Sequence, residues 1–275
     1  MPFATFVLST GRCGTQWLAH HLAGIGVPGL TVEHEPLSNS YQPRLMLGAK
    51  DPANLDPQLA APILAHADRI EQALETGDYI ECGHPCWSTL PYFAKRFAGR
   101  MRIIHLVRHP VPTACSWLTH QAYCTPLLPH LPAKVLLSPF DAGVRFLEYC
   151  ETWPELNPYE KALYYWTEIN AAGLEWEQSL GVPWLRVTYE DVFGGQGLPA
   201  LHDFLGIEAG TPAKTGLRVD QFYYISAGLY DWQGIANHPH TLQVCQQLDY
   251  DPMSVNGQAL QQRYLAGVPI SSSAA

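Results

Sequence analysis

The sequence predicts an α/β protein in which a central, mostly parallel sheet is flanked by helices. Two segments each combine a short apolar strand, a turn containing Gly or Pro, and the start of a helix. Other short apolar runs alternate with segments whose apolar residues recur at helical spacing, which is typical of parallel sheets with crossover helices. The expected strands are Phe3–Leu8, Val27–Val32, Tyr79–Cys82, Arg102–Arg108 and Val182–Val187. The expected helices begin near Thr15 and near Pro110 or span Leu59–Leu74, Ser88–Phe97, Pro158–Leu180 and Leu198–Leu205.

The first strand–turn–helix segment carries the sequence STGRCGTQW directly after its strand. A turn between a strand and a helix start points several backbone N–H groups at one anion. Gly11 and Gly14 allow a tight turn and a close approach of a phosphate to the main chain. Arg12 adds a permanent charge with a fork of donors, and Thr15 and Gln16 add side-chain donors. The segment therefore predicts a cradle for a phosphate or sulfate. The loop of P-loop kinases, G-x-x-x-x-G-K-[ST], is absent because no Lys precedes the Thr.

The second such segment contains RIIHLVR, then HPVP, then a helix-like TACSWL. Arg108 ends the strand and Ser116 follows eight residues later, about two turns into the next helix. This offset allows one guanidinium and one hydroxyl to converge on a second anion.

The composition limits the classes of partner. The chain has 275 residues and a net charge of −9, so nucleic acid and anionic membrane surfaces are poor partners. It contains no apolar run long enough to span a membrane and no secretory signal, so we expect one cytoplasmic domain over residues 1–275. The seven cysteines form no C-x-x-C pair, so neither disulfides nor a zinc site is indicated. Cys13, at a helix start beside Arg12, is expected to favour the thiolate and to be sensitive to oxidation.

Together the two strand–turn–helix segments resemble the sulfotransferases that use 3′-phosphoadenosine 5′-phosphosulfate (PAPS). TGRCGTQW is similar to that family's [KR]-x-G-T-x-W loop, IIHLVRHPVPTACSW to its 3′-phosphate motif, and LRVTYEDV to its strand ending in Y-E-D-[LV]. The resemblance implies a P-loop-like three-layer fold and sulfuryl transfer without a metal, leaving the product 3′-phosphoadenosine 5′-phosphate (PAP). The resemblance becomes weaker beyond Gly210, where Lys214 and Arg218 are weak candidates for further contacts with PAPS.

The resemblance also assigns roles to residues. It implies that Arg12 neutralises charge on the leaving phosphate, that Arg108 and Ser116 hold the 3′-phosphate, and that Tyr189 approaches the adenosine. The residues implied around the 5′-phosphosulfate are Arg12, Cys13, Gly14, Thr15, Gln16 and Trp17.

The sequence offers two candidates for the general base, Glu35 and His84. A sulfuryl acceptor loses a proton as it attacks, so a base must lie near the transferred group. The expected second strand ends in EHEP, at the edge where open α/β sheets build their sites. Similarity to bacterial and protein-tyrosine sulfotransferases implies Glu35 as base, with Glu33 second. Similarity to a K-x-H-x-P segment of cytosolic members implies His84 instead, although Glu81 replaces the Lys.

The acceptor is only broadly constrained. Residues 38–58 are expected to form a loop and residues 119–158 a lid over the acceptor. Residues 141–160 hold five carboxylates and one arginine, which indicates either a neutral or cationic small acceptor, such as an alkaloid, or a solvated acidic face. The acceptor group is a hydroxyl or an amine. The alternatives are a carbohydrate or protein-tyrosine sulfotransferase, a small-molecule kinase, and a non-catalytic nucleotide-binding module. The oligomeric state is not indicated.

Overall fold

The structure is a computed structural model that describes residues 1–37, 41–124, 135–208 and 230–260. The chain divides into two compact units. The first comprises Met1–Arg108, Asp141–Val144 and Ile169–Val219, and the second comprises His109–Phe140, Arg145–Glu168 and Asp220–Ala275.

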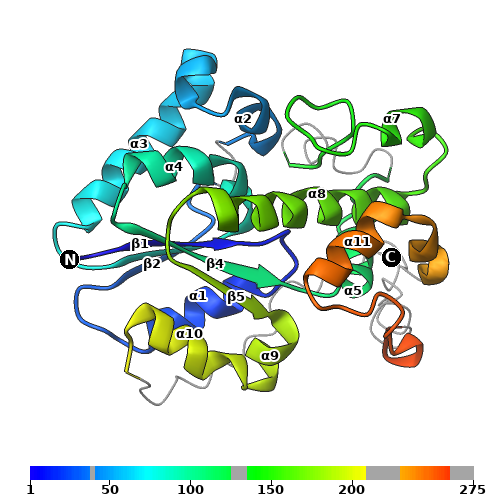
Figure 1. The fold of residues 1–275 in the computed structure, drawn as a ribbon. Helices are drawn as coiled ribbons and strands as arrows, with labels where there is room; N and C mark the ends of the chain where they lie inside the picture. The colour runs from blue at the N-terminus through cyan, green and yellow to red at the C-terminus, as the bar shows by residue number, and fades with distance from the viewer. Residues whose placement is uncertain (38–40, 125–134, 209–229, 261–275) are drawn as a thin grey trace, which may run out of the picture. The chain divides into compact units, whose positions relative to one another are not determined.

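The first unit is built on a five-stranded sheet in the described residues, and every strand pair is parallel. The strand order β2-β3-β1-β4-β5 places β1 at the centre, so the chain moves to opposite sides of β1 as it adds strands (Figure 1). Open α/β sheets of this kind form their ligand sites beyond the carboxyl ends of the central strands. The strands are β1 (Ala4–Leu8), β2 (Thr31–His34), β3 (Tyr79–Cys82), β4 (Met101–Val107) and β5 (Trp184–Thr188).

Helices cover both faces of this sheet (Figure 1). One face carries α1 (Thr15–Gly24), α9 (Tyr189–Gly194) and α10 (Gly197–Leu205). The other carries α3 (Pro57–Ala73), α4 (Leu90–Arg96) and the second half of α8 (Pro158–Ser179). Alternate strand residues face opposite sides, so each face has its own core. The core under α1 and α10 includes Val7, Leu18, Leu22, Ile80, Ile104, Leu106, Leu201 and Leu205.

The largest differences from the sequence predictions for this unit are at β2 and at residues 41–58. β2 starts four residues later than expected, because residues 27–30 form a turn in which Gly29 has φ +78°. Residues 41–58 are not simply a loop, because they contain α2 (Pro43–Ala49) and the 3-10 helix η1 (Pro52–Asn54). A proline opens each of these helices, where its missing N–H costs nothing.

A 3-10 helix, η2 (His84–Thr89), connects β3 to α4. It begins at the first residue after Gly83 and so places His84 directly beyond the end of β3.

The second unit is helical in its described residues. It contains α5 (Pro110–Leu118), α7 (Tyr149–Thr152), the first half of α8, η4 (Trp232–Asn237) and α11 (Pro239–Gln247). The Tyr159 hydroxyl donates to the Trp232 carbonyl at 2.9 Å, and the Thr167 and Thr241 hydroxyls lie 2.7 Å apart, so α8 is tied to η4 and α11.

The predicted lid, residues 119–158, falls partly on residues 125–134, which lie outside the described ranges. Its described part contains the short helix α7. Its role as a lid stays a prediction.

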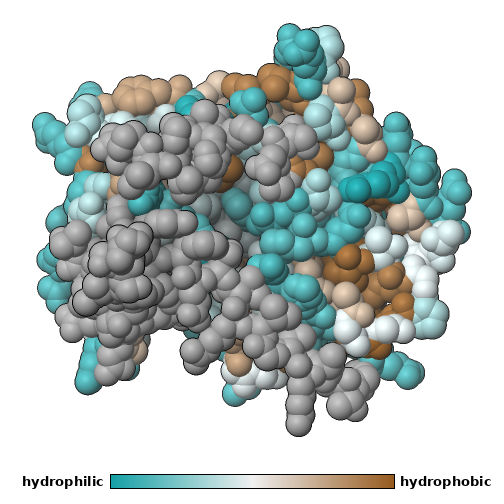
Figure 2. Space-filling model, turned by 180° about the vertical axis from the view of Figure 1, so that it is seen from behind, coloured by the Kyte–Doolittle hydropathy of each residue, from teal (hydrophilic) through white to brown (hydrophobic). Residues whose placement is uncertain are grey.

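Among the described residues, none of the helices combines the length and the apolar character needed to cross a membrane. On the described part of the face in Figure 2, hydrophilic residues separate the hydrophobic groups.

Candidate active site

The turn between β1 and α1 has the backbone geometry of an anion cradle. Gly11, Arg12 and Gly14 have φ values of 72°, 59° and 78°, all in the left-handed region. Arg12 is the informative member, because a residue other than glycine adopts this conformation only uncommonly. Such turns direct successive backbone N–H groups to one side, and the amides of the first turn of α1, from Thr15 onward, also lack partners within the helix.

Cys13 stabilises this turn from within, which contradicts the prediction of a reactive thiolate. Its side chain is fully buried, and its thiol donates to the Gly11 carbonyl at 3.2 Å and lies 3.4 Å from the Thr10 hydroxyl. Burial raises the pKa of the Cys13 thiol despite hydrogen bonding to Thr10 and the positive charge of Arg108. The side chain of Cys13 therefore serves the shape of the loop, and only its backbone is available to an anion.

Arg108 reaches the turn from the end of β4. Its side chain is almost entirely buried, and Nη1 donates to the Arg12 carbonyl at 2.7 Å. The guanidinium carbon lies 4.4 Å from the centre of the Tyr189 ring, a cation–π arrangement. Thr188 caps α9 by accepting from the Asp191 amide at 3.0 Å, so Tyr189 opens this helix beside the turn. Arg12, predicted to bind the 5′-phosphosulfate, and Tyr189, predicted to approach the adenosine, thus both contact the guanidinium of Arg108.

Aromatic rings continue from Tyr189 along one side of the turn. Tyr189 stacks on Phe193 at 4.2 Å between ring centres, Phe193 lies 4.8 Å from Trp17, and Trp17 stacks on His21 at 5.0 Å. A side chain at Gly14 would overlap the Phe193 ring, so the glycine lets this ring pack against the turn. The sequence did not single out Phe193, although its position four residues after Tyr189 on one helix face was a usable signal.

The two candidate bases meet. The His84 imidazole donates from Nδ1 to Oε1 of Glu35, and these atoms lie 3.0 Å apart. Glu35 has φ +49°, so the chain turns sharply directly after β2. An added Cβ at Gly83 would lie 2.8 Å from both the amide nitrogen and Cγ of Glu35, so only glycine permits this approach. Because β2 and β3 are neighbours, residues 49 positions apart in the chain form one dyad.

The dyad is electrostatically biased toward an ionised carboxylate. Burial raises the pKa of Glu35, but the hydrogen bond from His84 and the charges of His84, His34 and Arg12 outweigh it and lower the pKa to about 2. Arg12 therefore acts on the dyad as well as on the turn, which brings the predicted base and the predicted anion cradle into one site.

His34 joins the turn to the end of β2, a contact that sequence reasoning missed. Its Nε2 shares a hydrogen bond with the Thr15 hydroxyl at 3.3 Å and lies 3.8 Å from Oε1 of Glu35. The alternation of side chains along β2 was the available signal, since it places His34 on the α1 face and Glu33 on the other.

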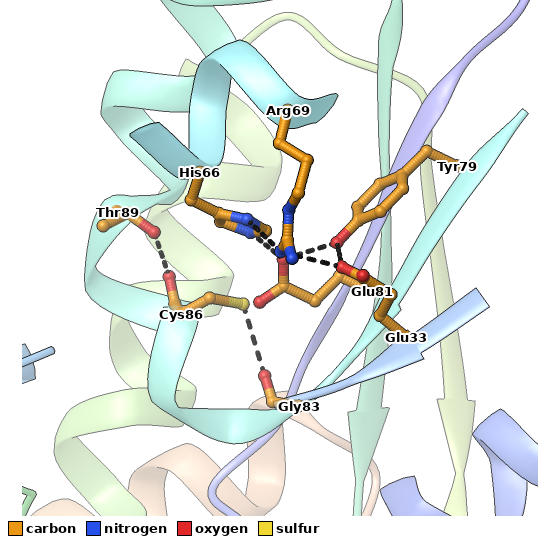
Figure 3. Close-up of polar contacts among 8 residues, drawn as sticks. All are labelled: Glu33, His66, Arg69, Tyr79, Glu81, Gly83, Cys86 and Thr89. Carbon is orange, nitrogen blue, oxygen red and sulfur yellow. Dashed lines mark hydrogen bonds and ion pairs between the residues drawn. The ribbon is translucent and has the colours of Figure 1, made fainter. Parts of the chain in front are cut away.

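Glu33, the second choice for the base, lies elsewhere. Its Oε2 accepts from the Tyr79 hydroxyl at 2.6 Å and from Nη2 of Arg69 at 3.0 Å (Figure 3). These contacts place Glu33 on the α3 face of the sheet, in a separate cluster of polar side chains.

The remaining predicted residues are only partly placed. Gln16 lies in the first turn of α1 and is half-buried. Ser116 lies in α5, which begins at Pro110 as expected, and is buried. It belongs to the second unit while Arg108 ends the first, so their convergence on a 3′-phosphate stays a prediction. Lys214 and Arg218 lie outside the described residues.

Comparison with known proteins identifies the class of fold. No protein-family model and no curated protein matches the chain. Among solved structures, the chain is similar to the sulfotransferase domain from the curacin biosynthetic pathway, with a TM-score of 0.52, 16% identity, and coverage of 91% of this chain and 99% of that one. It is also similar to the sulfotransferase domain from the Synechococcus PCC 7002 olefin synthase, with a TM-score of 0.51, 19% identity, and coverage of 91% and 95%.

These similarities establish the fold. The chain has the α/β fold of sulfotransferase domains, which confirms the predicted fold class.

Proposed function

We propose that this protein is a sulfotransferase that moves a sulfuryl group from PAPS to a hydroxyl or amine of a small molecule. The observation that carries the proposal is the Glu35–His84 dyad, at 3.0 Å, beside a turn of anion-cradle geometry in a sulfotransferase fold. A nucleotide-binding module would need the turn but not a dyad capable of accepting a proton.

The described residues fit the donor nucleotide. The left-handed turn and the first amides of α1 suit the 5′-phosphosulfate, and Arg12 supplies charge where the leaving phosphate becomes more negative. The proposed contacts of the 3′-phosphate are Arg108 and Ser116, and Tyr189 is the proposed neighbour of the adenosine. When bound, the donor supplies the activated sulfuryl group, and the chain's residues position it and the acceptor.

Within the dyad, His84 is the better base and Glu35 its positioning partner. A general base works best when its pKa lies near the operating pH, and a carboxylate with a pKa of about 2 holds a proton poorly at neutral pH. Since Nδ1 of His84 donates to Glu35, the lone pair lies on Nε2 whenever the imidazole is neutral. In the proposed step, the acceptor oxygen or nitrogen forms a bond to sulfur and gives its proton to Nε2 of His84. The bond from sulfur to the 5′-phosphate oxygen breaks, and PAP leaves.

The acceptor is proposed to be a small molecule. Both solved domains of the same fold come from small-molecule contexts by their descriptions, a biosynthetic pathway and an olefin synthase, which supports this class. A cationic acceptor is less well supported, because several carboxylates of residues 141–160 already have partners. Asp141 pairs with Arg44, Glu148 with His240 and Glu160 with His238.

The test is direct. The protein is incubated with PAPS and a panel of small-molecule hydroxyls and amines, and mass spectrometry follows the gain of SO₃. We expect one class of acceptor to be sulfated and PAP to form in equal amount. Binding of PAP with no turnover across a broad panel would favour the non-catalytic module, and transfer from ATP that depends on magnesium would favour the kinase.

Two variants separate the roles within the dyad. His84→Ala is expected to lower kcat by about 10²- to 10⁴-fold, the usual contribution of a general base. Glu35→Gln, which can still accept from His84, is expected to lose less. PAP affinity, measured by calorimetry, should be unchanged in both. A larger loss in Glu35→Gln than in His84→Ala would make Glu35 the base.

A further inference from the structure

A partly buried cluster of polar side chains joins the ends of β2 and β3 to helix α3 (Figure 3). We call it the strand-end cluster, and its members are Glu33 on β2, Tyr79 and Glu81 on β3, and His66 and Arg69 on α3. None of these residues has a part in the proposed donor site or in proton transfer. The cluster therefore needs its own explanation.

The register of the two strands creates an electrostatic problem that the cluster solves. Glu33 and Glu81 are direct partners in the parallel pairing of β2 and β3, so two carboxylates lie side by side on one face. Like charges in this arrangement destabilise a sheet. Glu81 is almost fully buried, which makes an uncompensated charge still more costly.

Three donors compensate these carboxylates. The His66 imidazole donates from Nε2 to Oε2 of Glu81 at 2.7 Å. Nη2 of Arg69 donates to Oε2 of Glu33 at 3.0 Å, and the Tyr79 hydroxyl donates to the same oxygen at 2.6 Å. Burial, together with the neighbouring Glu81 and Glu33, raises the pKa of Tyr79, so its hydroxyl keeps its proton and remains a donor.

The contacts of His66 fix its protonation state. Nη2 of Arg69 lies 2.8 Å from Nδ1 of His66, and a guanidinium can only donate. Nδ1 must therefore accept, which leaves the single ring proton on Nε2, where it is donated to Glu81. His66 is thus a neutral bridge that joins the Arg69–Glu33 pair to Glu81, and it lies one helical turn before Arg69 on the same face of α3.

The cluster lies at the two strand ends from which the dyad extends. Glu35 follows Glu33 by two residues, and His84 follows Glu81 by three. Gly83, which lies between Glu81 and His84, is also stabilised, because its carbonyl accepts from the Cys86 thiol at 3.2 Å (Figure 3). A shift of either strand end along the other would move Glu35 relative to His84, since Gly83 and Glu35 are already in close contact.

We infer that His66 is a positioning residue, which bridges Arg69–Glu33 and Glu81 to hold the ends of β2 and β3 in the register that aligns Glu35 with His84. The kinetic part of this inference rests on the proposed function. Its structural part, that the strand ends depend on the bridge, does not.

Three variants and one matched control test the inference. His66→Leu removes the bridge. His66→Gln restores it, because one amide carries both a donor for Glu81 and an acceptor for Arg69. Arg69→Met removes the contacts of Arg69 with Glu33 and His66. Because Arg69 is half-exposed, this variant tests the bridge even if His66→Leu does not fold. Arg96→Met is the control, because Arg96 also contacts α3, through Asp68 at 3.0 Å and Glu71 at 2.7 Å, but not through the strand-end cluster.

The expected kinetic result is a loss in kcat alone. His66→Leu should lower kcat by about 10- to 100-fold, the scale of a small misplacement of reacting groups. Arg69→Met should lower it less, and the KM for the donor and the affinity for PAP should be unchanged in both. His66→Gln should recover most of the activity, and Arg96→Met should match the parent. Unchanged kcat in folded His66→Leu and Arg69→Met, no recovery in His66→Gln, or an equal loss in Arg96→Met would each overturn the inference.

A readout that needs no activity separates this inference from the proposed function. Hydrogen exchange of the backbone amides of Glu35 and His84 should become faster in His66→Leu and Arg69→Met, and should match the parent in His66→Gln and Arg96→Met. If the parent sulfates no acceptor, the proposed function fails while this exchange pattern still decides the structural inference. Exchange unchanged in all the variants would overturn it.

Discussion

At the scale of single residues, Gly83 determines whether the dyad can form. Its backbone is extended, so conformational strain is not the issue. A Cβ there would lie 2.8 Å from Cγ of Glu35 and 3.0 Å from its Cα, and neither atom can move without displacing the carboxylate. Gly83→Ala is therefore expected to lower kcat at least tenfold, with PAP affinity retained, as measured by steady-state kinetics and calorimetry. Gly234→Ala is the control, because nothing lies within 4 Å of its added Cβ. A fully active Gly83→Ala enzyme would show that the contact of Glu35 with His84 is dispensable.

The ionisation of Glu35 predicts how stability depends on pH. Its pKa is lowered to about 2 from the ordinary value of 4.5, so the unfolded chain binds more protons than the folded one in this range. The stabilisation by Glu35 is thus fully present above about pH 4.5 and is lost as the pH falls toward 2. Because the carboxylate is partly exposed, we expect a contribution of only about 2 kcal/mol to the free energy of unfolding.

Urea unfolding of the parent and of Glu35→Gln between pH 2.5 and 7 measures this contribution. The difference in the free energy of unfolding should grow as the pH rises from 2.5 and should level off above about pH 4.5. Glu75→Gln, at an exposed glutamate, is the matched control. A difference for Glu35→Gln that stays constant across the range would contradict the lowered pKa.

Sequence reasoning found the members of the dyad but not the dyad. Glu35 and His84 were each predicted from a local pattern, as alternatives for one role. Their contact depends on the pairing of β2 with β3 and on the left-handed backbone of Glu35, and neither is visible in a local pattern. The wrong prediction for Cys13 has a similar cause. A position beside Arg12 suggested a thiolate, but burial by the rest of the fold decided its pKa.

At the scale of elements, the buried strands were the most predictable part. β1, β3 and β4 lie within a residue of the expected bounds, because their apolar runs are short and end in clear turns. β2 and α2 were harder, since β2 is only half-buried and polar, and α2 begins after a segment rich in turn-forming residues. The position of Glu33 on the α3 face was not predicted, because the bounds expected for β2 ended before Glu33.

The packing of α9 against α1 gives an element-scale prediction. Phe193 joins the two helices by contacting both Tyr189 and Trp17, although 39% of its side chain is exposed. Phe193→Ala should lower the free energy of unfolding by about 1 kcal/mol and weaken PAP binding severalfold, because Tyr189 loses its stacking partner. Phe140→Ala, at a ring with 65% exposure, is the control and should change neither quantity. Unaltered PAP affinity in Phe193→Ala would exclude the Tyr189 face from the nucleotide site.

At the scale of the whole molecule, the charge is unfavourable for the proposed donor. A net charge of −9 repels a polyphosphorylated nucleotide at long range, so recognition must come from a few local cations and backbone amides. Several of the arginines already pair with carboxylates of the same chain. Arg102 pairs with Asp78 and Arg186 with Glu177, as Arg44, Arg69 and Arg96 pair with their own carboxylates.

This distribution predicts a selective stabilisation of the folded protein by PAP. A ligand that binds only the folded state at 100 times its Kd adds about 2.7 kcal/mol, which corresponds to a rise in Tm of roughly 5 to 10 °C for a protein of this size. Adenosine 5′-phosphate, which lacks the 3′-phosphate, should raise Tm less at the same concentration, and ATP with magnesium should raise it least.

Arg108→Lys keeps the charge but loses the guanidinium fork that contacts the Arg12 carbonyl and the Tyr189 ring, so it should lose most of the PAP-dependent shift. Thermal unfolding monitored by fluorescence provides the measurement, with Arg96→Lys as the control for replacing an arginine outside the site. Equal shifts with PAP and adenosine 5′-phosphate would mean that no second anion site exists, and a larger shift with magnesium-ATP would favour phosphoryl over sulfuryl transfer.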